Sequence, residues 1–305
     1  MENLKSIAVI YGGSSSEREI SIQSGLGVHQ AILDLGYKSF LKDFNDLDDL
    51  ANLKDYDMVF IALHGIEGEG GKLQQDLASL GIKYTGSSSI ACQNTWNKWK
   101  CKEILASKGI STPRGFTCPA NELESCSPFE KFRTIYSEIP DSLFMKPEED
   151  GSSVDIYEIK NDYDYHKALG DCKNMKRSFI FEEAIRNREF TVTIIDKRCF
   201  PIIEIKTDNQ FYDYDAKYLS DETSMTEANS SVLDLEAANK IALNAYNALG
   251  CIGWARVDLL QDENGVLYVI EINTVPGMTS HSCVPKSGSF INLSYQEIVQ
   301  KIINA

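Results

Sequence analysis

Short apolar runs alternate with segments of helical periodicity in the N-terminal third of the chain. Apolar strands are predicted at 6–11 and 57–63, and helices at 19–35 and 72–80, with a glycine directly after each helix. Glycine at this position is typical of a helix end. Short strands that alternate with helices indicate a parallel sheet covered on both faces. The first unit of the chain is therefore predicted to be an α/β domain.

Two further units, in which strands predominate, are predicted in the rest of the chain. The second unit combines a helix with three strands, at 98–108, 143–146, 154–160 and 178–183. The third unit combines four strands with two helices, at 190–195, 200–206, 254–260, 266–272, 235–249 and 294–303. The polar segment 207–229 is longer than most structureless loops, which favours a lid or a binding loop, and 273–288 is predicted to be a loop.

Length and charge narrow the class of protein. A chain of 305 residues with 43% hydrophobic residues is long enough for two or three domains with their own cores. The net charge of −15 disfavours binding to nucleic acid or to an anionic membrane surface. A phosphate ligand would therefore need local lysines, arginines or metal ions.

Targeting and cysteine patterns point to a cytoplasmic protein. The apolar run near the N-terminus stops at Gly12-Gly13, and it is too short for a signal peptide or a membrane span. None of the eight cysteines forms a C-x-x-C pair, so a zinc site is not expected. Free thiols are predicted instead, as is usual in a reducing compartment.

The late pair of strands carries the most informative group of polar side chains. Arg256 and Asp258 lie two residues apart on one strand, and Glu271 and Asn273 lie two apart on the next. Asn264-Gly265 between the strands is a strong hairpin signal. With these two residues as the loop, Asp258 lies opposite Glu271, and Arg256 lies opposite Asn273. A loop that moved the pairing by two would keep the same side chains on this face.

Facing carboxylates in such a hairpin indicate a cation site. Cβ atoms of directly opposed residues lie roughly 5 Å apart, so Asp258 and Glu271 repel each other unless a cation lies between them. Two carboxylates and an amide oxygen are hard ligands that suit Mg²⁺. The alternative interpretation is a solvated polar face on an edge hairpin.

Three other segments are candidate ligand sites. Lys146 ends a strand before the loop Gly151-Ser152-Ser153, which can hold phosphate through N–H groups and hydroxyls, although an ordinary surface loop is equally compatible. Glu17 follows a glycine turn at a helix N-terminus, where it can meet an ammonium group or simply complement the helix dipole. His64 follows an apolar strand, where parallel sheets carry ligand residues. No G-x-G-x-x-G or Walker A motif is present.

Taken together, these residues resemble the D-alanine–D-alanine ligase family of the ATP-grasp superfamily. The matching segments occur in family order over nearly the full length, at 12–21, 62–65, 84–87, 146–147, 151–154, 189–192, 211–218, 253–258 and 271–282. The resemblance implies an α/β fold in which an N-terminal parallel-sheet (pre-ATP-grasp) domain, 1–94, precedes an ATP-grasp fold of two α+β subdomains. These subdomains are 95–185 and 186–305, with ATP held between them.

The resemblance also implies an activity and a cellular role. Two D-alanines are joined to D-alanyl-D-alanine for peptidoglycan precursor synthesis, at the expense of ATP. The first carboxylate attacks the γ-phosphate, and the amine of the second D-alanine attacks the resulting D-alanyl phosphate. Because acyl phosphates hydrolyse, water must be excluded, which gives the segment 207–229 a purpose as a lid. The implied partners are small molecules only, and a homodimer is one compatible oligomeric state.

Individual roles follow from the same resemblance. The residues implied to hold ATP are Lys98, Lys146, Ser152, Glu182, Ile185, Glu189, Phe211 and Lys217. Two Mg²⁺ (or Mn²⁺) ions are assigned to Asp258, Glu271 and Asn273. Substrate binding is assigned to Glu17, His64, Arg256, Gly277 and Ser282, and catalysis to Glu17, Ser152, Tyr218, Arg256 and Ser282. Within these sets, Arg256 and the backbone near Gly277 stabilise the oxyanion.

Two departures and two rival functions accompany the resemblance. Asp155 stands where the family usually has glycine, which adds a charge beside the phosphate loop, and Asn97 stands where an aspartate is common. One rival is another carboxylate–amine ligase, or a ligase that makes a D-alanyl–D-lactate ester. Tyr218 argues against the ester-forming enzyme, because the resemblance places phenylalanine there in some ester-forming relatives. The other is a catalytically silent nucleotide-binding module, against which the four hairpin residues argue.

Overall fold

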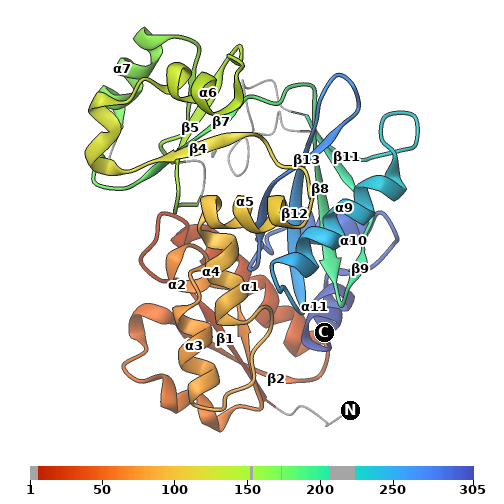
Figure 1. Ribbon diagram of the computed structural model, residues 1–305. Helices are drawn as coiled ribbons and strands as arrows, with labels where there is room; N and C mark the ends of the chain where they lie inside the picture. Colours follow the sequence, from red (N-terminus) through yellow and green to blue (C-terminus); the bar gives the residue numbers. More distant parts are fainter. Residues whose placement is uncertain (1–5, 152–153, 173, 207–223) are drawn as a thin grey trace.

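Three sheets follow one another along the chain, and each has its own hydrophobic core (Figure 1). The computed structural model describes residues 6–151, 154–172, 174–206 and 224–305. All eight cysteines lie within these ranges and are free thiols. Within the same ranges, no helix has the length and apolarity that a bilayer crossing requires.

The first sheet is parallel, with strand order β2-β1-β3. Its elements are β1 (Ser6–Tyr11), α1 (Arg18–Asp34), β2 (Lys38–Asp43), η1 (Phe44–Asp46), η2 (Leu50–Asp55), β3 (Met58–Ile61), α2 (Ile66–Glu69), α3 (Lys72–Ser79) and α4 (Ser89–Trp96). The two predicted helices are confirmed to within one residue at each end. Strand β2 was not predicted, because it is an edge strand without a fully buried residue.

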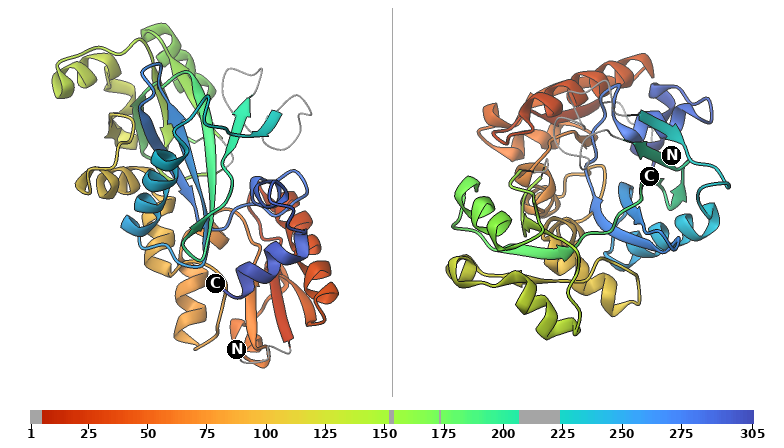
Figure 2. Two further views of the ribbon diagram at one scale, coloured as in Figure 1. Left: turned by 90° about the vertical axis from the view of Figure 1, so that its right-hand side faces the viewer. Right: turned by 90° about the horizontal axis from the view of Figure 1, so that it is seen from above.

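Helices from both ends of the chain cover this sheet. Helix α1 packs against the C-terminal helix α11 (Tyr295–Ile303), and α3 lies on the other side of the strands (Figure 2). Ser294 and Glu297 form a capping box at the start of α11. Its buried residues Ile298 and Ile302 belong to the first core. The end of the chain therefore returns to the N-terminal sheet and carries the preceding segment across to it.

The second sheet is antiparallel, with strand order β4-β7-β5-β6. Its elements are β4 (Gly115–Cys118), η3 (Ala120–Ser125), α6 (Pro128–Tyr136), β5 (Leu143–Pro147), β6 (Tyr157–Ile159), α7 (Asp162–Asp171) and β7 (Phe179–Glu183). Met145 and Phe181 point into the core, so their neighbours Lys146 and Glu182 lie on the other face. The prediction that β6 begins at 154 was wrong, because Asp155 has a left-handed backbone with φ of 56°.

The third sheet has strand order β11-β10-β8-β12-β13, and β9 pairs with β8. Its elements are β8 (Arg188–Ile195), β9 (Arg198–Cys199), β10 (Ile203–Lys206), β11 (Ser224–Glu227), α9 (Leu235–Ala248), β12 (Trp254–Gln261), β13 (Leu267–Asn273) and α10 (Cys283–Ser289). Two expectations need correction: α10 is a helix inside the predicted loop 273–288, and 224–227 forms strand β11. The predicted lid otherwise falls on 207–223, outside the described residues.

Helix α5 (Lys98–Ser107) joins the second and third sheets. It precedes β4 in the chain, yet its residues Cys101 and Leu105 pack in the core of the third sheet beside α9. Figure 1 shows α5 running across the middle of the molecule, between β4 above it and the first domain below. Helix α5 therefore lies where the three sheets meet.

Candidate active site

The register predicted for the late hairpin is confirmed, but the predicted loop is wrong. Asp258 pairs with Glu271, and Arg256 pairs with Asn273, as expected. The loop has three residues rather than two, because the Asp262 N–H donates to the Val266 carbonyl at 3.0 Å. This longer loop shifts the pairing of the two strands by one residue. By itself, that shift would move Glu271 and Asn273 to the opposite face of the sheet. A bulge that leaves Ile270 unpaired restores the register before it reaches Glu271.

Arg256 and Asp258 form a close ion pair on the face of this hairpin. The Arg256 Nε and Nη2 atoms donate to the Asp258 carboxylate at 2.9 and 2.7 Å, and the Thr191 hydroxyl donates to it at 2.6 Å. Burial opposes the charge on Arg256, but Asp258 raises the pKa of its guanidinium well above the usual value. Glu271 Oε1 lies 4.0 Å from Arg256 Nη2. The guanidinium therefore lies beside both carboxylates.

The donor chemistry of this face fits a magnesium ion. The Asp258 side chain is 9% exposed and the Glu271 side chain 35% exposed, so the pair opens outward from a buried base. Asn273 Oδ1 accepts a hydrogen bond from the Val275 N–H at 3.0 Å, which fixes the amide at the end of β13. In the described part of the chain no cluster of three or more His, Cys, Asp or Glu side chains forms a ready cage. Mg²⁺ commonly takes its remaining ligands from water and phosphates.

His64 links the first sheet to the segment that follows β13. Its Nδ1 contacts the Val275 carbonyl at 3.0 Å, and its Nε2 contacts the Ser24 hydroxyl at 3.2 Å. Since a carbonyl only accepts, Nδ1 carries the proton and Nε2 accepts from Ser24. Burial lowers the pKa of His64, an effect that Glu17 opposes. The neutral imidazole, and Ser24 which accepts from the Met278 N–H at 3.0 Å, hold this segment against the first domain.

Two buried carboxylates of the first domain face this segment. Glu17, at the start of α1, lies so close to the phosphate loop that a Cβ on Gly151 would be 2.8 Å from its Oε2. Any larger residue at 151 would therefore displace the Glu17 carboxylate. Glu69, which the sequence analysis missed, accepts from the Gly65 N–H at 3.0 Å. Burial, reinforced by Glu17, raises the pKa of Glu69 well above its usual value, and the charge of Glu271 acts in the same direction.

Lysines of α5 and β5 gather around a carboxylate of β7. Lys146 contacts one oxygen of Glu182, and Lys102 contacts the other at 2.8 Å. Burial alone would raise the pKa of Glu182, but the two ammonium groups hold it below its usual value. Lys102 was not predicted to be a site residue, although its spacing of four from Lys98 places both on one face of a helix. Lys98 donates to the Asp150 carbonyl at 2.5 Å.

Asn97, one of the two departures from the family pattern, caps α5. Its Oδ1 accepts from the Lys100 N–H at 2.8 Å, and its Nδ2 donates to Glu149 Oε1 at 2.9 Å. Asparagine thus satisfies the helix end and ties the phosphate loop to it. The substitution keeps Lys98 at the first position of the helix.

Other predicted residues are placed less centrally or are outside the described ranges. Ser282 precedes α10, and a Cβ on Gly277 would lie 2.7 Å from its Oγ, so these two residues are neighbours. Glu189 pairs with Leu260 on β12 and is half-buried, and Ile185 is half-buried between β7 and β8. The residues outside the described ranges are Ser152, Phe211, Lys217 and Tyr218.

The lysine group and the hairpin belong to one site. The charges of Lys98, Glu182 and Glu271 all act on the buried thiol of Cys101 in α5. Those of Glu17 and Arg256 both act on His64. The three sheets therefore bring together the lysines around Glu182, the carboxylates of β12 and β13, and the buried carboxylate Glu17 of the first domain.

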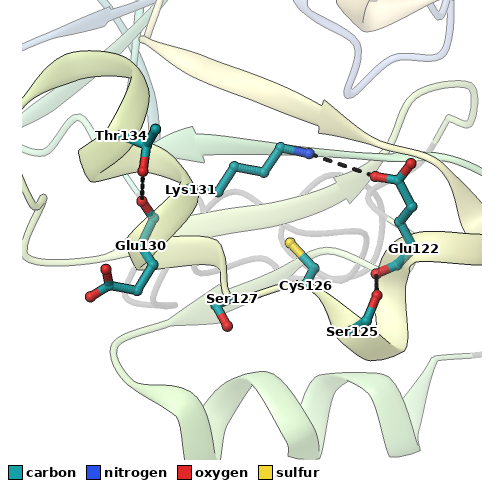
Figure 3. A pocket seen from close by; sticks show the side chains of 7 residues that line it. All are labelled: Glu122, Ser125, Cys126, Ser127, Glu130, Lys131 and Thr134. Carbon is teal, nitrogen blue, oxygen red and sulfur yellow. Dashed lines mark hydrogen bonds and ion pairs between the residues drawn. The ribbon is translucent and has the colours of Figure 1, made fainter.

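A separate pocket lies away from this centre (Figure 3). It measures about 390 Å³ and is lined by Glu122, Ser125, Cys126, Ser127, Glu130, Lys131 and Thr134. These residues come from η3 and α6, on the core side of the second sheet, whereas Lys146 and Glu182 lie on its opposite face. None of the predicted site residues lines this pocket.

Comparison with known proteins identifies relatives over the full length. Residues 104–304 match the family described as "D-ala D-ala ligase C-terminus". A protein of Marinomonas sp. (strain MWYL1) described as D-alanine--D-alanine ligase is 38% identical over 307 residues, covering 97% of this chain and 94% of that protein. A D-alanine--D-alanine ligase B of Chromobacterium violaceum is 36% identical, covering 100% of this chain and 98% of that protein.

Solved structures with the same fold include two kinds of ligase. The crystal structure of a D-alanine--D-alanine ligase from Bacillus anthracis complexed with ATP has a TM-score of 0.84 at 30% identity, covering 98% of this chain and 96% of that one. The VanG D-Ala:D-Ser ligase from Enterococcus faecalis has a TM-score of 0.82 at 25% identity, covering 99% of each chain.

Proposed function

The chain belongs to the D-alanine–D-alanine ligase family, and we propose that the centre around Arg256, Asp258 and Glu271 joins two D-alanines. The enzyme is an ATP-dependent ligase that makes D-alanyl-D-alanine for peptidoglycan precursors. The observation that carries the assignment of the site is the register of β12 and β13. It places Asp258 opposite Glu271 with Arg256 beside both, next to the first-domain residues Glu17 and His64.

The first half-reaction uses the buried carboxylate Glu17 of the first domain and the lysines around Glu182. Glu17 binds the ammonium group of the first D-alanine, and this orients the substrate carboxylate toward the γ-phosphate of ATP. Lys98 and Lys146 hold the phosphates, together with Ser152 and Lys217. Lys102 stays on Glu182 and keeps it ionised, so that Lys146 is able to turn from Glu182 to a phosphate. Phosphoryl transfer needs such alignment and charge neutralisation rather than a protein nucleophile.

The second half-reaction uses Arg256 and the segment after β13. The amine of the second D-alanine attacks the carbonyl of the D-alanyl phosphate, and negative charge develops on the carbonyl oxygen. Arg256 and the backbone N–H near Gly277 donate to that oxygen, a type of contact that stabilises the transition state strongly. Ser282 binds the carboxylate of the second D-alanine. Phosphate then leaves with one oxygen of the first D-alanine.

Asp258, Glu271 and Asn273 hold two Mg²⁺ or Mn²⁺ ions in this proposal. When bound, the ions neutralise the phosphate charge and align the transferred group. Glu271 is the more exposed of the two carboxylates, and it would hold the ions together with Asp258 and Asn273. Glu182 and the backbone near Ile185 contact adenine, and Glu189 contacts the ribose. Phe211 also belongs to the nucleotide-binding residues. Glu17, Ser152 and Tyr218 form the hydrogen-bonded set that closes the site.

Domain division and cellular context complete the proposal. The domains are 1–94, 95–185 and 186–305, with α5 bridging the last two and α11 returning to the first. The ligase works in the cytoplasm, where ATP is available, and acts on small molecules as a monomer or a homodimer.

Stereochemistry of the substrate tests the proposed function. With ATP and Mg²⁺, phosphate release is expected to require D-alanine and to be absent with L-alanine. When Glu17 and Arg256 hold the ammonium and carboxyl groups, the methyl group of L-alanine would point to the side where D-alanine has hydrogen. The assay measures phosphate release with each enantiomer, and with D-serine or D-lactate supplied as the second substrate. Equal rates for the two enantiomers would overturn the assignment, and faster turnover with D-serine or D-lactate would reassign the second substrate.

A further inference from the structure

Asp155 occupies a position whose backbone favours glycine. Its φ of 56° lies in the left-handed region, which few residues other than glycine, asparagine and aspartate adopt readily. The family usually has glycine here, and this chain has a carboxylate whose side chain is only 1% exposed. A buried carboxylate is costly unless a cation and hydrogen bonds compensate it.

Arg177 supplies that compensation and reaches a second carboxylate. Its Nη2 contacts Asp155, and its Nη1 contacts Asp150. The Tyr157 hydroxyl also donates to Asp155 at 2.9 Å. Arg177 lies just before β7, the strand that carries Glu182, and its guanidinium lies 5.6 Å from the centre of the Phe179 ring. One guanidinium thus binds two acidic side chains from different points of the chain.

These two carboxylates stand at the two ends of the phosphate loop. Asp150 directly precedes Gly151, and Asp155 directly follows Val154, whose N–H donates to the Gly151 carbonyl at 3.3 Å. Lys98 donates to the carbonyl of Asp150, and Gly151 lies against Glu17. The position of the loop ends therefore decides where the loop meets the rest of the site.

We propose that Arg177 is a positioning residue for nucleotide binding, which bridges Asp150 and Asp155 and thereby fixes the phosphate loop and neutralises its flanking carboxylates. The inference rests on the proposed function, since it takes this loop as the one that binds the phosphates. Without Arg177, two negative side chains would remain beside the binding site of a polyanion, and the ends of the loop would lose their common anchor. Asp155 and Arg177 act as a pair that replaces the glycine of the family.

Nucleotide affinity in a set of three variants tests this pair. Arg177→Met is expected to raise the Kd of a non-hydrolysable ATP analogue with Mg²⁺ about tenfold, because Asp150 and Asp155 would then lie uncompensated beside a polyanion. Arg177→Met combined with Asp155→Gly removes the arginine together with one of its two carboxylate partners and restores the family glycine. Its Kd is therefore expected to fall back to within about threefold of the parent, with Asp150 as the one uncompensated carboxylate left. Arg177→Lys keeps the positive charge but cannot contact both carboxylates at once as a guanidinium does. Its Kd is expected to lie between those of the parent and Arg177→Met.

Steady-state kinetics separates positioning from a purely structural role. Arg177→Met is expected to raise the KM for ATP while kcat at saturation stays within about twofold, whereas a loss of folded enzyme would lower kcat instead. Arg133→Met, which removes an exposed arginine paired with Glu130 on α6, is the matched control and should change neither value. The proposal for Arg177 and Asp155 would be overturned if both single variants bound the analogue with the Kd of the parent. It would also be overturned if the double variant had a Kd as high as that of Arg177→Met. Because the analogue binds without D-alanine, failure here is distinguishable from failure of the ligase assignment.

Discussion

Replacing Glu271 with glutamine is expected to lower the rate of D-alanyl-D-alanine synthesis about a hundredfold or more while the fold stays intact. Glu271 faces Asp258 across the strand pair and is the more exposed of the two carboxylates. The glutamine removes a repulsion between like charges, so the metal-free protein should melt at the same temperature or higher. Turnover is expected to fall because a neutral amide would be a much weaker ligand for Mg²⁺ than a carboxylate.

The measurement pairs thermal melting in a chelator with phosphate release in Mg²⁺. Glu263→Gln, an exposed substitution in the turn of the same hairpin, is the control and should leave both unchanged. A much lower melting temperature for Glu271→Gln would make Glu271 a structural residue. Normal turnover would show that the hairpin does not hold the catalytic metal.

Arg256→Met is expected to lower both the free energy of unfolding and the rate of turnover by a large amount. Addition of Mg²⁺ is expected to restore the free energy of unfolding but not the turnover. Without the guanidinium, Asp258 is left as a buried carboxylate facing Glu271, which costs roughly 3–5 kcal/mol when a buried ion pair loses one partner. A metal ion at the same carboxylates replaces the missing positive charge and stabilises the folded state. Turnover should stay at least about a hundredfold below the parent, because the oxyanion has lost a donor.

Denaturant unfolding with and without Mg²⁺, for the parent and Arg256→Met, measures this difference. Arg198→Met, an exposed arginine on β9 of the same sheet, is the control and should unfold like the parent. The prediction fails if Mg²⁺ stabilises parent and Arg256→Met equally. It fails also if Arg256→Met retains normal turnover in Mg²⁺.

Strands and helices with a strong periodicity could be predicted from the sequence, and those without it could not. The helices after β1 and β3 were predicted closely, because apolar positions recur at helical spacing and a glycine follows each one. Strand β2 was not predicted because no residue in it is fully buried, and α10 was not predicted because it is short and contains Pro285 and Gly288. The start of β6 was misplaced because a left-handed aspartate gives no sequence signal.

The hairpin of the site shows a correct prediction that rested on a wrong premise. A two-residue loop was expected, whereas the loop has three residues and a bulge at Ile270 cancels the shift. Residues two apart on one strand point to the same face of the sheet, whatever the length of the loop that follows. The pairing of Arg256 with Asp258 on one face therefore did not depend on the predicted loop. The position of a bulge depends on packing across the sheet, which local sequence does not reveal.

Contacts between distant segments account for the residues that were missed. Lys102, Glu69 and Arg177 become informative only when the fold places each beside a partner far along the chain, such as Glu182 for Lys102. In the sequence they are ordinary charged residues on a helix or in a turn. Sequence spacing can bring Lys102 beside Lys98, but it cannot show that Lys102 contacts Glu182.

Transfer of oxygen from substrate to phosphate tests the central claim most directly. D-Alanine labelled with ¹⁸O in its carboxylate is incubated with the enzyme, ATP and Mg²⁺, and the phosphate and the dipeptide are analysed by mass spectrometry. With both carboxylate oxygens labelled, one of them attacks the γ-phosphate and leaves with it. One phosphate that carries a single ¹⁸O is therefore expected for each D-alanyl-D-alanine formed. Unlabelled phosphate, or labelled phosphate without dipeptide, would contradict ligation through a D-alanyl phosphate.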